Sequence, residues 1–160
     1  MKKPPKKGKV VRLVKRARMP TRTTRARIAY LKPDPSAWPV VKVFISPNRR
    51  HMRTQAQWVD RSRTCARTQG QVFSWQKGPR RRAHLVRGRI VARMYLNVDD
   101  LKAEPAELMA HECAHAGMAW ARWRRVDLTN MEHGEEVLCY AVGRMMTQLN
   151  NIAYKFGVFG

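Results

Sequence analysis

The chain has 160 residues, 44% of them hydrophobic, which suits one domain with a core of its own. Its 33 lysines and arginines outnumber its 11 aspartates and glutamates, and the formal net charge of +22 favours polyanionic partners. The sequence has no apolar run of the roughly 18 residues that cross a bilayer. Its three scattered cysteines exclude a disulfide framework and a cysteine-built zinc ribbon. We therefore expect a cytoplasmic protein in a reducing compartment, without membrane contact.

Residues 1–36 are predicted to form a basic, extended arm ahead of a domain over residues 37–160. The arm holds 13 basic side chains and a single acidic one, Asp34. Repulsion between like charges and the prolines among them oppose compaction. Two short apolar segments within the arm, Val10–Val14 and Ile28–Leu31, could still dock on the domain or on a partner.

The first half of the domain favours β-structure. Residues 40–45 are β-branched and apolar and end at Ser-Pro-Asn, which predicts a strand. Residues 49–69 indicate a basic helix or loop, and residues 71–75 a second short strand. Residues 84–98 alternate between two sets of side chains, which is the pattern of a half-exposed strand. Three strands are therefore expected before the main helices begin.

Two helices are expected after these strands. Residues 97–100 offer turn and N-cap chemistry, and Pro105 suits the first turn of a helix over about residues 105–124. A second helix over about residues 134–150 carries an apolar stripe made of Leu138, Ala141, Val142, Met145 and Leu149. This order of elements predicts an α+β fold, in which a small mixed sheet of about three strands packs on two helices.

The first of these helices carries the motif His111-Glu112-x-x-His115. Two histidines four residues apart lie one turn apart on the same helix face, so both rings can reach one zinc ion. The glutamate beside them can accept a proton from a water molecule that the metal activates. Only about 0.006 such motifs are expected by chance in a chain of this composition. His111 and His115 are therefore candidate metal ligands, and Glu112 is the candidate catalytic base.

A catalytic zinc ion needs a third protein ligand and one open position. Glu135 and Glu136, at the start of the second helix, are the candidates, and the residue pattern does not separate them. One of the two is expected to bind the metal while the other complements the helix dipole. Tyr140 and His133 are candidate donors to the oxyanion that forms during hydrolysis. Cys113 points away from both motif histidines and is expected to be a core thiol.

Three segments carry a resemblance to a known family: Tyr95-Leu96-Asn97-Val98-Asp99-Asp100-Leu101, His111-Glu112-x-x-His115-Ala116, and Glu135-Glu136-x-x-Cys139-Tyr140-x-x-Gly143. Over roughly residues 40–150 the chain resembles the metallopeptidases common in bacteriophage genomes, which are zincins similar to SprT-like and minimal gluzincin domains. The resemblance implies a zincin-like domain with a Zn2+ cofactor and a protein or peptide substrate. The sequence shows no cysteine ribbon of the kind found in many SprT-like proteins, so their role in DNA repair is not carried over.

The resemblance also implies roles for particular residues. In such families the strand before the H-E-x-x-H helix is the sheet edge to which an extended peptide adds. Here that role falls on Arg93, Met94, Tyr95 and Leu96. The family's pattern of a glutamate followed by a tyrosine favours Glu136 as the third ligand, whereas a thermolysin-like spacing favours Glu135.

The sequence therefore predicts a zinc-dependent peptidase that hydrolyses peptide bonds with metal-activated water and is associated with nucleic acid. The nucleic acid would bind without sequence specificity to the basic arm and the arginine-rich surface. In a phage setting it would be the packaged genome, the host nucleoid or a virion component near DNA. The alternative is a nucleic-acid-binding or virion-associated structural protein on a zincin scaffold with vestigial chemistry. The intact motif favours the peptidase, because a vestigial site is free to lose Glu112.

Overall fold

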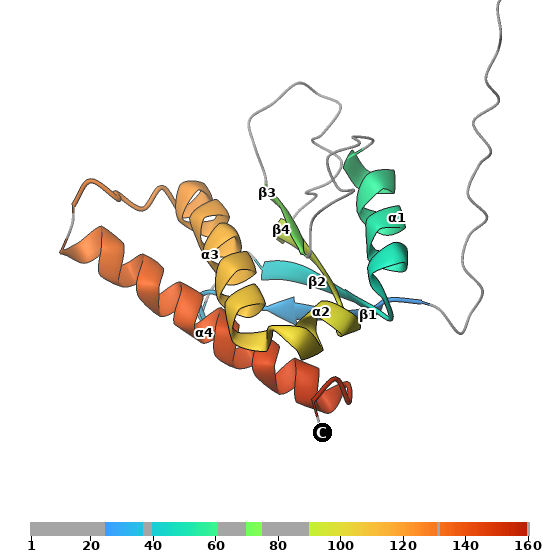
Figure 1. Cartoon of the computed structure of the whole chain (residues 1–160). Coiled ribbons are helices and arrows are strands. Elements are labelled where there is room, and N and C mark those ends of the chain that lie inside the picture. The colour runs from blue at the N-terminus through green and yellow to red at the C-terminus, as the bar shows by residue number, and fades with distance from the viewer. Residues whose placement is uncertain (1–24, 37–39, 61–69, 75–89, 131, 160) are drawn as a thin grey trace, which may run out of the picture.

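A computed structural model of the chain describes residues 25–36, 40–60, 70–74, 90–130 and 132–159 (Figure 1). Within these residues the elements follow one another as β1 (Arg27–Leu31), β2 (Val40–Ser46), α1 (Arg49–Asp60), β3 (Gln71–Ser74), β4 (Ile90–Asn97), α2 (Val98–Ala103), α3 (Pro105–Arg124) and α4 (His133–Lys155). The four strands form one sheet, and helices pack on both of its faces.

The sheet is mixed, with the strand order β1-β2-β4-β3. β2 and β4 run parallel, from Val41 opposite Ala92 to Ser46 opposite Asn97. β1 is antiparallel to β2, and β3 is antiparallel to β4. Two parallel neighbours require a crossover, and here α1 lies in the stretch of chain between them. The parallel pair occupies the middle of the sheet, with one antiparallel strand at each edge.

The two faces of the sheet are covered by different helices (Figure 1). Successive side chains of a strand point to opposite faces. Val43 and Met94 therefore join the main core, which the sheet forms with α3 and α4. Phe44 and Tyr95, their neighbours along the strands, point the other way and pack against α1. The main core thus lies under the helix that carries the candidate site.

A buried aspartate joins the end of β4 to the start of α1. Asn97 caps α2 by accepting a hydrogen bond from the backbone N of Asp100 at 2.9 Å, and its Nδ2 donates to Asp100 Oδ2 at 2.6 Å. Arg49 donates from Nε to the same oxygen at 3.0 Å and forms an ion pair with Oδ1. Burial acts to raise the pKa of Asp100, but hydrogen bonds from Arg49 and Asn97 lower it overall. These contacts hold α2, and with it the beginning of α3, against α1.

The outer strand β1 is also tied to α4. Gln148 accepts a hydrogen bond from the backbone N of Lys32, just after β1, and donates one to the backbone O of the same residue, both at 2.9 Å. The guanidinium of Arg27 lies over the ring of Phe156, 5.4 Å from its centroid. The edge of the sheet is therefore anchored at both ends of β1.

The expected α+β fold, a mixed sheet packed on two helices, is confirmed. α3 begins at Pro105 and ends at Arg124, as predicted, and Asn97 caps the short helix before it. α4 runs from His133 to Lys155 and is longer than expected. None of the helices in the described part of the chain is long and apolar enough to span a membrane.

The predicted end of the basic arm at residue 36 is wrong. Residues 27–31 form β1, and Leu31 is completely buried in the main core. The apolar run from Ile28 to Leu31 outweighs the local charge there, because pairing with β2 satisfies the backbone and buries Leu31. The sheet accordingly has four strands rather than about three. The apolar segment Val10–Val14, the rest of the arm to residue 24, and residues 61–69 and 84–89 lie outside the described residues.

Candidate metal centre

Close packing against α4 fixes the rotation of α3. A Cβ at Gly117 would lie 2.6 Å from Cγ2 of Val142 and 3.2 Å from Cδ1 of Leu138, so only glycine allows the two helices to approach this closely. The buried face of α3 comprises Leu108, Met109, Glu112, Cys113, Ala116, Gly117, Ala119, Trp120 and Ala121. Both motif histidines lie outside this set and reach solvent.

His111 and His115 lie side by side on the exposed surface of α3. Their Nε2 atoms are 3.2 Å apart, and the rings meet edge to face at 79°. Two nitrogens that each lie about 2.1 Å from a tetrahedral zinc ion are about 3.4 Å from each other. The pair is therefore spaced to chelate one ion with little adjustment. The same spacing permits a hydrogen bond between one donating and one accepting ring.

Glu112 is the buried member of the motif. It is 3% exposed, and its Oε2 has no hydrogen-bond partner among the described residues. Burial raises the pKa of this carboxyl to about 7. A carboxyl with that pKa can both accept and donate a proton near neutral pH, as general acid–base catalysis requires.

The carboxyl of Glu112 lies against the beginning of β3. A Cβ at Gly70, the residue before that strand, would be 2.7 Å from Oε1 of Glu112. A side chain at this position would therefore require the carboxyl of Glu112 to shift. The sequence-based site did not include Gly70. The sequence does carry a signal for it: Gly70 directly precedes a short strand. A glycine at such a position marks a close approach between the backbone and another group.

Cys113 belongs to the core rather than to the candidate site. Its side chain is completely buried. Burial, and secondarily the nearby charge of Glu112, raises the pKa of the thiol to about 12. Since zinc binds the thiolate, a thiol that stays protonated is a poor ligand. The expected core position of Cys113 is confirmed.

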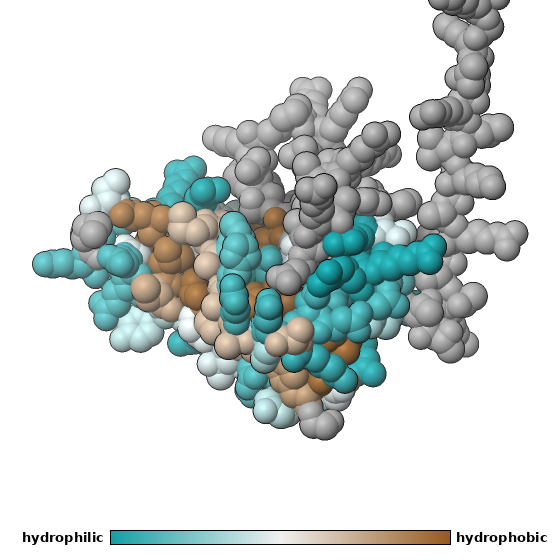
Figure 2. Space-filling model, viewed as in Figure 1, coloured by the Kyte–Doolittle hydropathy of each residue, from teal (hydrophilic) through white to brown (hydrophobic). Residues whose placement is uncertain are grey.

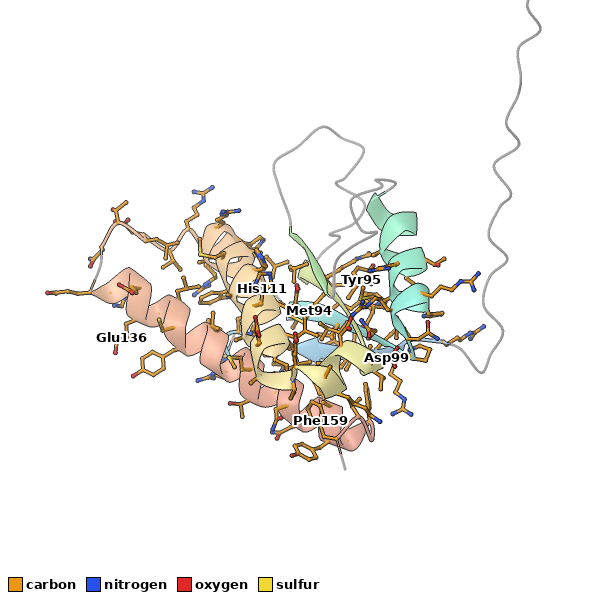
Figure 3. The ribbon with its side chains drawn as sticks, in the orientation of Figure 1. Met94, Tyr95, Asp99, His111, Glu136 and Phe159 are labelled. Carbon is orange, nitrogen blue, oxygen red and sulfur yellow. The ribbon has the colours of Figure 1, made fainter. Side chains whose placement is uncertain are left out.

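The two candidate third ligands do not join the histidines. Glu135 and Glu136 are exposed in the first turn of α4, and Figure 3 shows Glu136 well away from His111. The helices are antiparallel (Figure 1), and the contacts of Gly117 place Glu136 about 12 Å beyond His115 along their axes. Both histidines also point about 120° to 160° away from the side of α3 that faces α4. The described residues contain no cluster of three metal-binding side chains.

The candidate oxyanion donors lie on the same helix as the two glutamates. Tyr140 is 68% exposed, and His133 is exposed at the first residue of α4. Since α4 packs on the side of α3 that faces away from the motif histidines, the structure does not bring either side chain to the site.

The predicted position of the substrate edge strand is wrong. The residues expected there, Arg93, Met94, Tyr95 and Leu96, belong to β4, which pairs with β2 on one side and with β3 on the other. A strand with neighbours on both sides offers no free backbone edge to a peptide. Among the described residues, the edge strand beside α3 is β3. Whether a strand lies at the edge of a sheet depends on its pairing with strands that are distant in the sequence. The side-chain pattern of a single strand does not predict this pairing.

Comparison of the chain with protein-family models, with curated proteins and with solved structures finds no match. Any functional assignment therefore rests on the residues of the site and their geometry. The geometry brings together two ring nitrogens, one buried carboxyl and an edge strand.

Proposed function

We propose that the chain is a zinc-dependent peptidase of the zincin type, in which His111 and His115 hold Zn2+ and Glu112 is the general base. The observation that carries this proposal is the 3.2 Å spacing of two ring nitrogens on the helix turn that also carries a buried carboxylate oxygen without a hydrogen-bond partner among the described residues. Imidazole nitrogens are the ligands, and a carboxylate the base, that zinc hydrolases use. Burying a carboxylate oxygen that has no partner among the described residues is unfavourable for folding, and a catalytic use would explain why it is there.

The side chains of the site have separate tasks in this proposal. Bound zinc would polarise the scissile carbonyl and lower the pKa of a water molecule. His111 and His115 hold the ion at the protein surface, where a substrate can reach it. Glu112 takes a proton from the attacking water and passes it to the leaving amine. Gly70 keeps the space in which the carboxyl of Glu112 lies.

The proposed substrate is an extended peptide that adds to β3. This strand is antiparallel to β4, lies at the edge of the sheet and contacts α3. An edge strand binds peptides through main-chain hydrogen bonds, which are largely independent of sequence. A peptide on this strand would lie beside the helix that carries the two histidines.

The first test is the zinc content of the purified protein, measured by mass spectrometry after zinc add-back and desalting. We expect about one zinc ion per chain in the wild type and in Glu112→Gln, and a loss of most of it in His115→Ala. His133→Ala is the matched control, because His133 is also an exposed histidine but lies on another helix, and this variant should keep the ion. Wild-type protein without bound metal would overturn the proposal.

A second set of variants tests the third ligand. Glu135→Gln and Glu136→Gln are expected to retain zinc, because both carboxylates lie outside the histidine pair. Loss of zinc in either variant would instead show that α4 rearranges around the ion and that the glutamate is a ligand. Wild-type zinc content is the reference for both.

A nucleic-acid-binding protein without turnover is the second candidate function. It is favoured by the two-histidine cluster, which lacks a third ligand among the described residues. It is also favoured by charge, because residues 25–97 contain 17 basic and 2 acidic residues. A polyanion that neutralises this charge is proposed as a partner under both candidates. Zinc binding together with peptide hydrolysis that Glu112→Gln abolishes would decide for the peptidase.

A further inference from the structure

One face of the sheet is only partly covered by helices. Ile28 and Tyr30 of β1 pair in register with Phe44 and Lys42 of β2, and all four side chains point to the face opposite α3 and α4. We call these four residues the open sheet face. α1 packs on this side over β2 and β4, but Ile28 and Tyr30 remain 49% and 53% exposed. An apolar and an aromatic side chain are thus presented to solvent on a rigid strand.

The ammonium group of Lys42 lies near two aromatic rings of this face. The Nζ atom of Lys42 lies 5.7 Å from the centroid of the Tyr30 ring and 5.1 Å from that of Phe44. Phe44 in turn stacks on Tyr95, with ring centroids 4.7 Å apart and an angle of 5° between the planes. Tyr95 lies toward α1 and is buried (Figure 3). Tyr30 is therefore the exposed end of a row of rings, with a cation held beside it.

The surroundings of the open sheet face are strongly basic. β2, α1 and β4 together carry five lysines and arginines and one acidic residue, Asp60, and one of the five, Arg49, is paired with Asp100 of α2. Figure 2 shows hydrophilic residues gathered over α1, while apolar ones gather over α3 and α4. A partner that covers this face must therefore be an anion with flat, apolar groups.

We propose that the open sheet face binds single-stranded nucleic acid, with a base stacked on Tyr30 and a phosphate next to Lys42. Exposed aromatic rings flanked by cations are the arrangement with which single-strand-binding proteins hold bases and backbone together. In a duplex the base faces are already stacked on each other, so an exposed ring on a strand selects unpaired bases. This inference rests on the proposed polyanion partner and not on the zinc site, which lies on α3 across the sheet.

The test compares two strands of equal charge bound to the full-length protein. Fluorescence anisotropy would measure the affinity for a labelled 12-nucleotide oligo(dT) and for a 12-nucleotide strand of abasic sites. Stacking requires the base, whereas contacts to phosphate do not. We expect wild-type protein to bind oligo(dT) about tenfold more tightly than the abasic strand. Tyr30→Ala should lose this preference, and Tyr30→Phe should keep it.

Tyr140→Ala is the matched control, because Tyr140 is an exposed tyrosine on α4 and should leave the preference unchanged. Far-ultraviolet circular dichroism checks that each variant is folded. Equal affinity of the wild type for both strands would overturn the stacking site while leaving a charge-driven partner in place. A preference that survives in Tyr30→Ala would also overturn it. No binding of either strand would show that the proposed polyanion partner itself is wrong, and neither result would bear on zinc.

Discussion

The sheet with α1 and the pair of long helices differ sharply in charge. Among residues 25–97, those that the structure describes include 8 basic and 2 acidic residues, whereas residues 99–160 carry 6 basic and 9 acidic ones. The motif histidines and Glu112 lie in the second region, and the open sheet face lies in the first. A dense field of positive charge would hold a carboxyl ionised. Burial, with no charged neighbour among its causes, raises the pKa of Glu112 to about 7. Binding of a polyanion at the open sheet face and chemistry at the helix therefore need not compete.

The largest expected effect is on peptide hydrolysis, and each of two variants should change the activity of one region only. Glu112→Gln should lower peptide hydrolysis by about 100-fold or more, because the general base is lost. The same variant should bind oligo(dT) like wild type. Tyr30→Ala should show the reverse, with unchanged hydrolysis and weakened oligonucleotide binding. Initial rates on a quenched fluorescent peptide library and anisotropy titrations measure the two activities. If one substitution reduces both, the two regions are coupled and the comparison fails.

The contact between α3 and α4 gives the next largest effect. Gly117→Ala should lower the free energy of unfolding by about 1–3 kcal/mol, because the new methyl group would meet Val142 at 2.6 Å. Gly143→Ala is the matched control, since a Cβ at Gly143 has no neighbour within 4 Å. Removing that helical glycine should be neutral or stabilise by up to about 1 kcal/mol. Urea unfolding curves measure both values. Equal stabilities would show that the helices are not in close contact at Gly117.

The ion pair between the two regions should make stability depend on pH. The pKa of Asp100 is lowered in the folded protein, so its contribution is complete above the unfolded pKa of about 3.9 and is lost as pH falls through the folded pKa. Arg49→Met removes the main favourable partner, and burial then raises the pKa of Asp100. We expect the midpoint of acid unfolding to move to higher pH in this variant. Circular dichroism measures the acid unfolding of both proteins. An unchanged midpoint would mean that Arg49 does not hold Asp100.

The smallest expected effect concerns salt. The logarithm of the affinity for a nucleic acid falls linearly with the logarithm of the salt concentration. The slope of this line is proportional to the number of phosphates that the protein contacts. Lys42→Gln should reduce the slope of log affinity against log salt concentration by about 1. Lys102→Gln, an exposed lysine of α2, should leave the slope unchanged. An unaltered slope in Lys42→Gln would remove this lysine from the proposed contact with phosphate.

Local signals predicted the helices well. Pro105 marked the first residue of α3, and Asn97 capped the helix before it, because both act through their own backbone neighbourhood. Long-range features were harder. β1 lies in a segment whose charge suggested an extended arm. Its five residues alone do not indicate that it pairs with β2.

The site shows the same division between local and long-range signals. The spacing of His111 and His115 followed from one helical turn, so the sequence predicted their proximity. Whether Glu135 or Glu136 can reach the two histidines depends on the register between α3 and α4. The contact of Gly117 with Val142 sets this register. Spacing along the chain carries no information about that register. The close approach of Glu112 to Gly70 is likewise a contact between residues that are distant in the sequence.

Gln148 has a consequence for how the protein behaves at high concentration. β1 is an edge strand, and an unpaired edge invites another chain to extend the sheet. The side-chain amide of Gln148 both accepts from and donates to the backbone of Lys32, as the backbone of a neighbouring strand would. A second molecule therefore finds these two groups already used where β1 ends. Gln148 thus blocks the backbone of Lys32, directly after β1, against pairing with another chain.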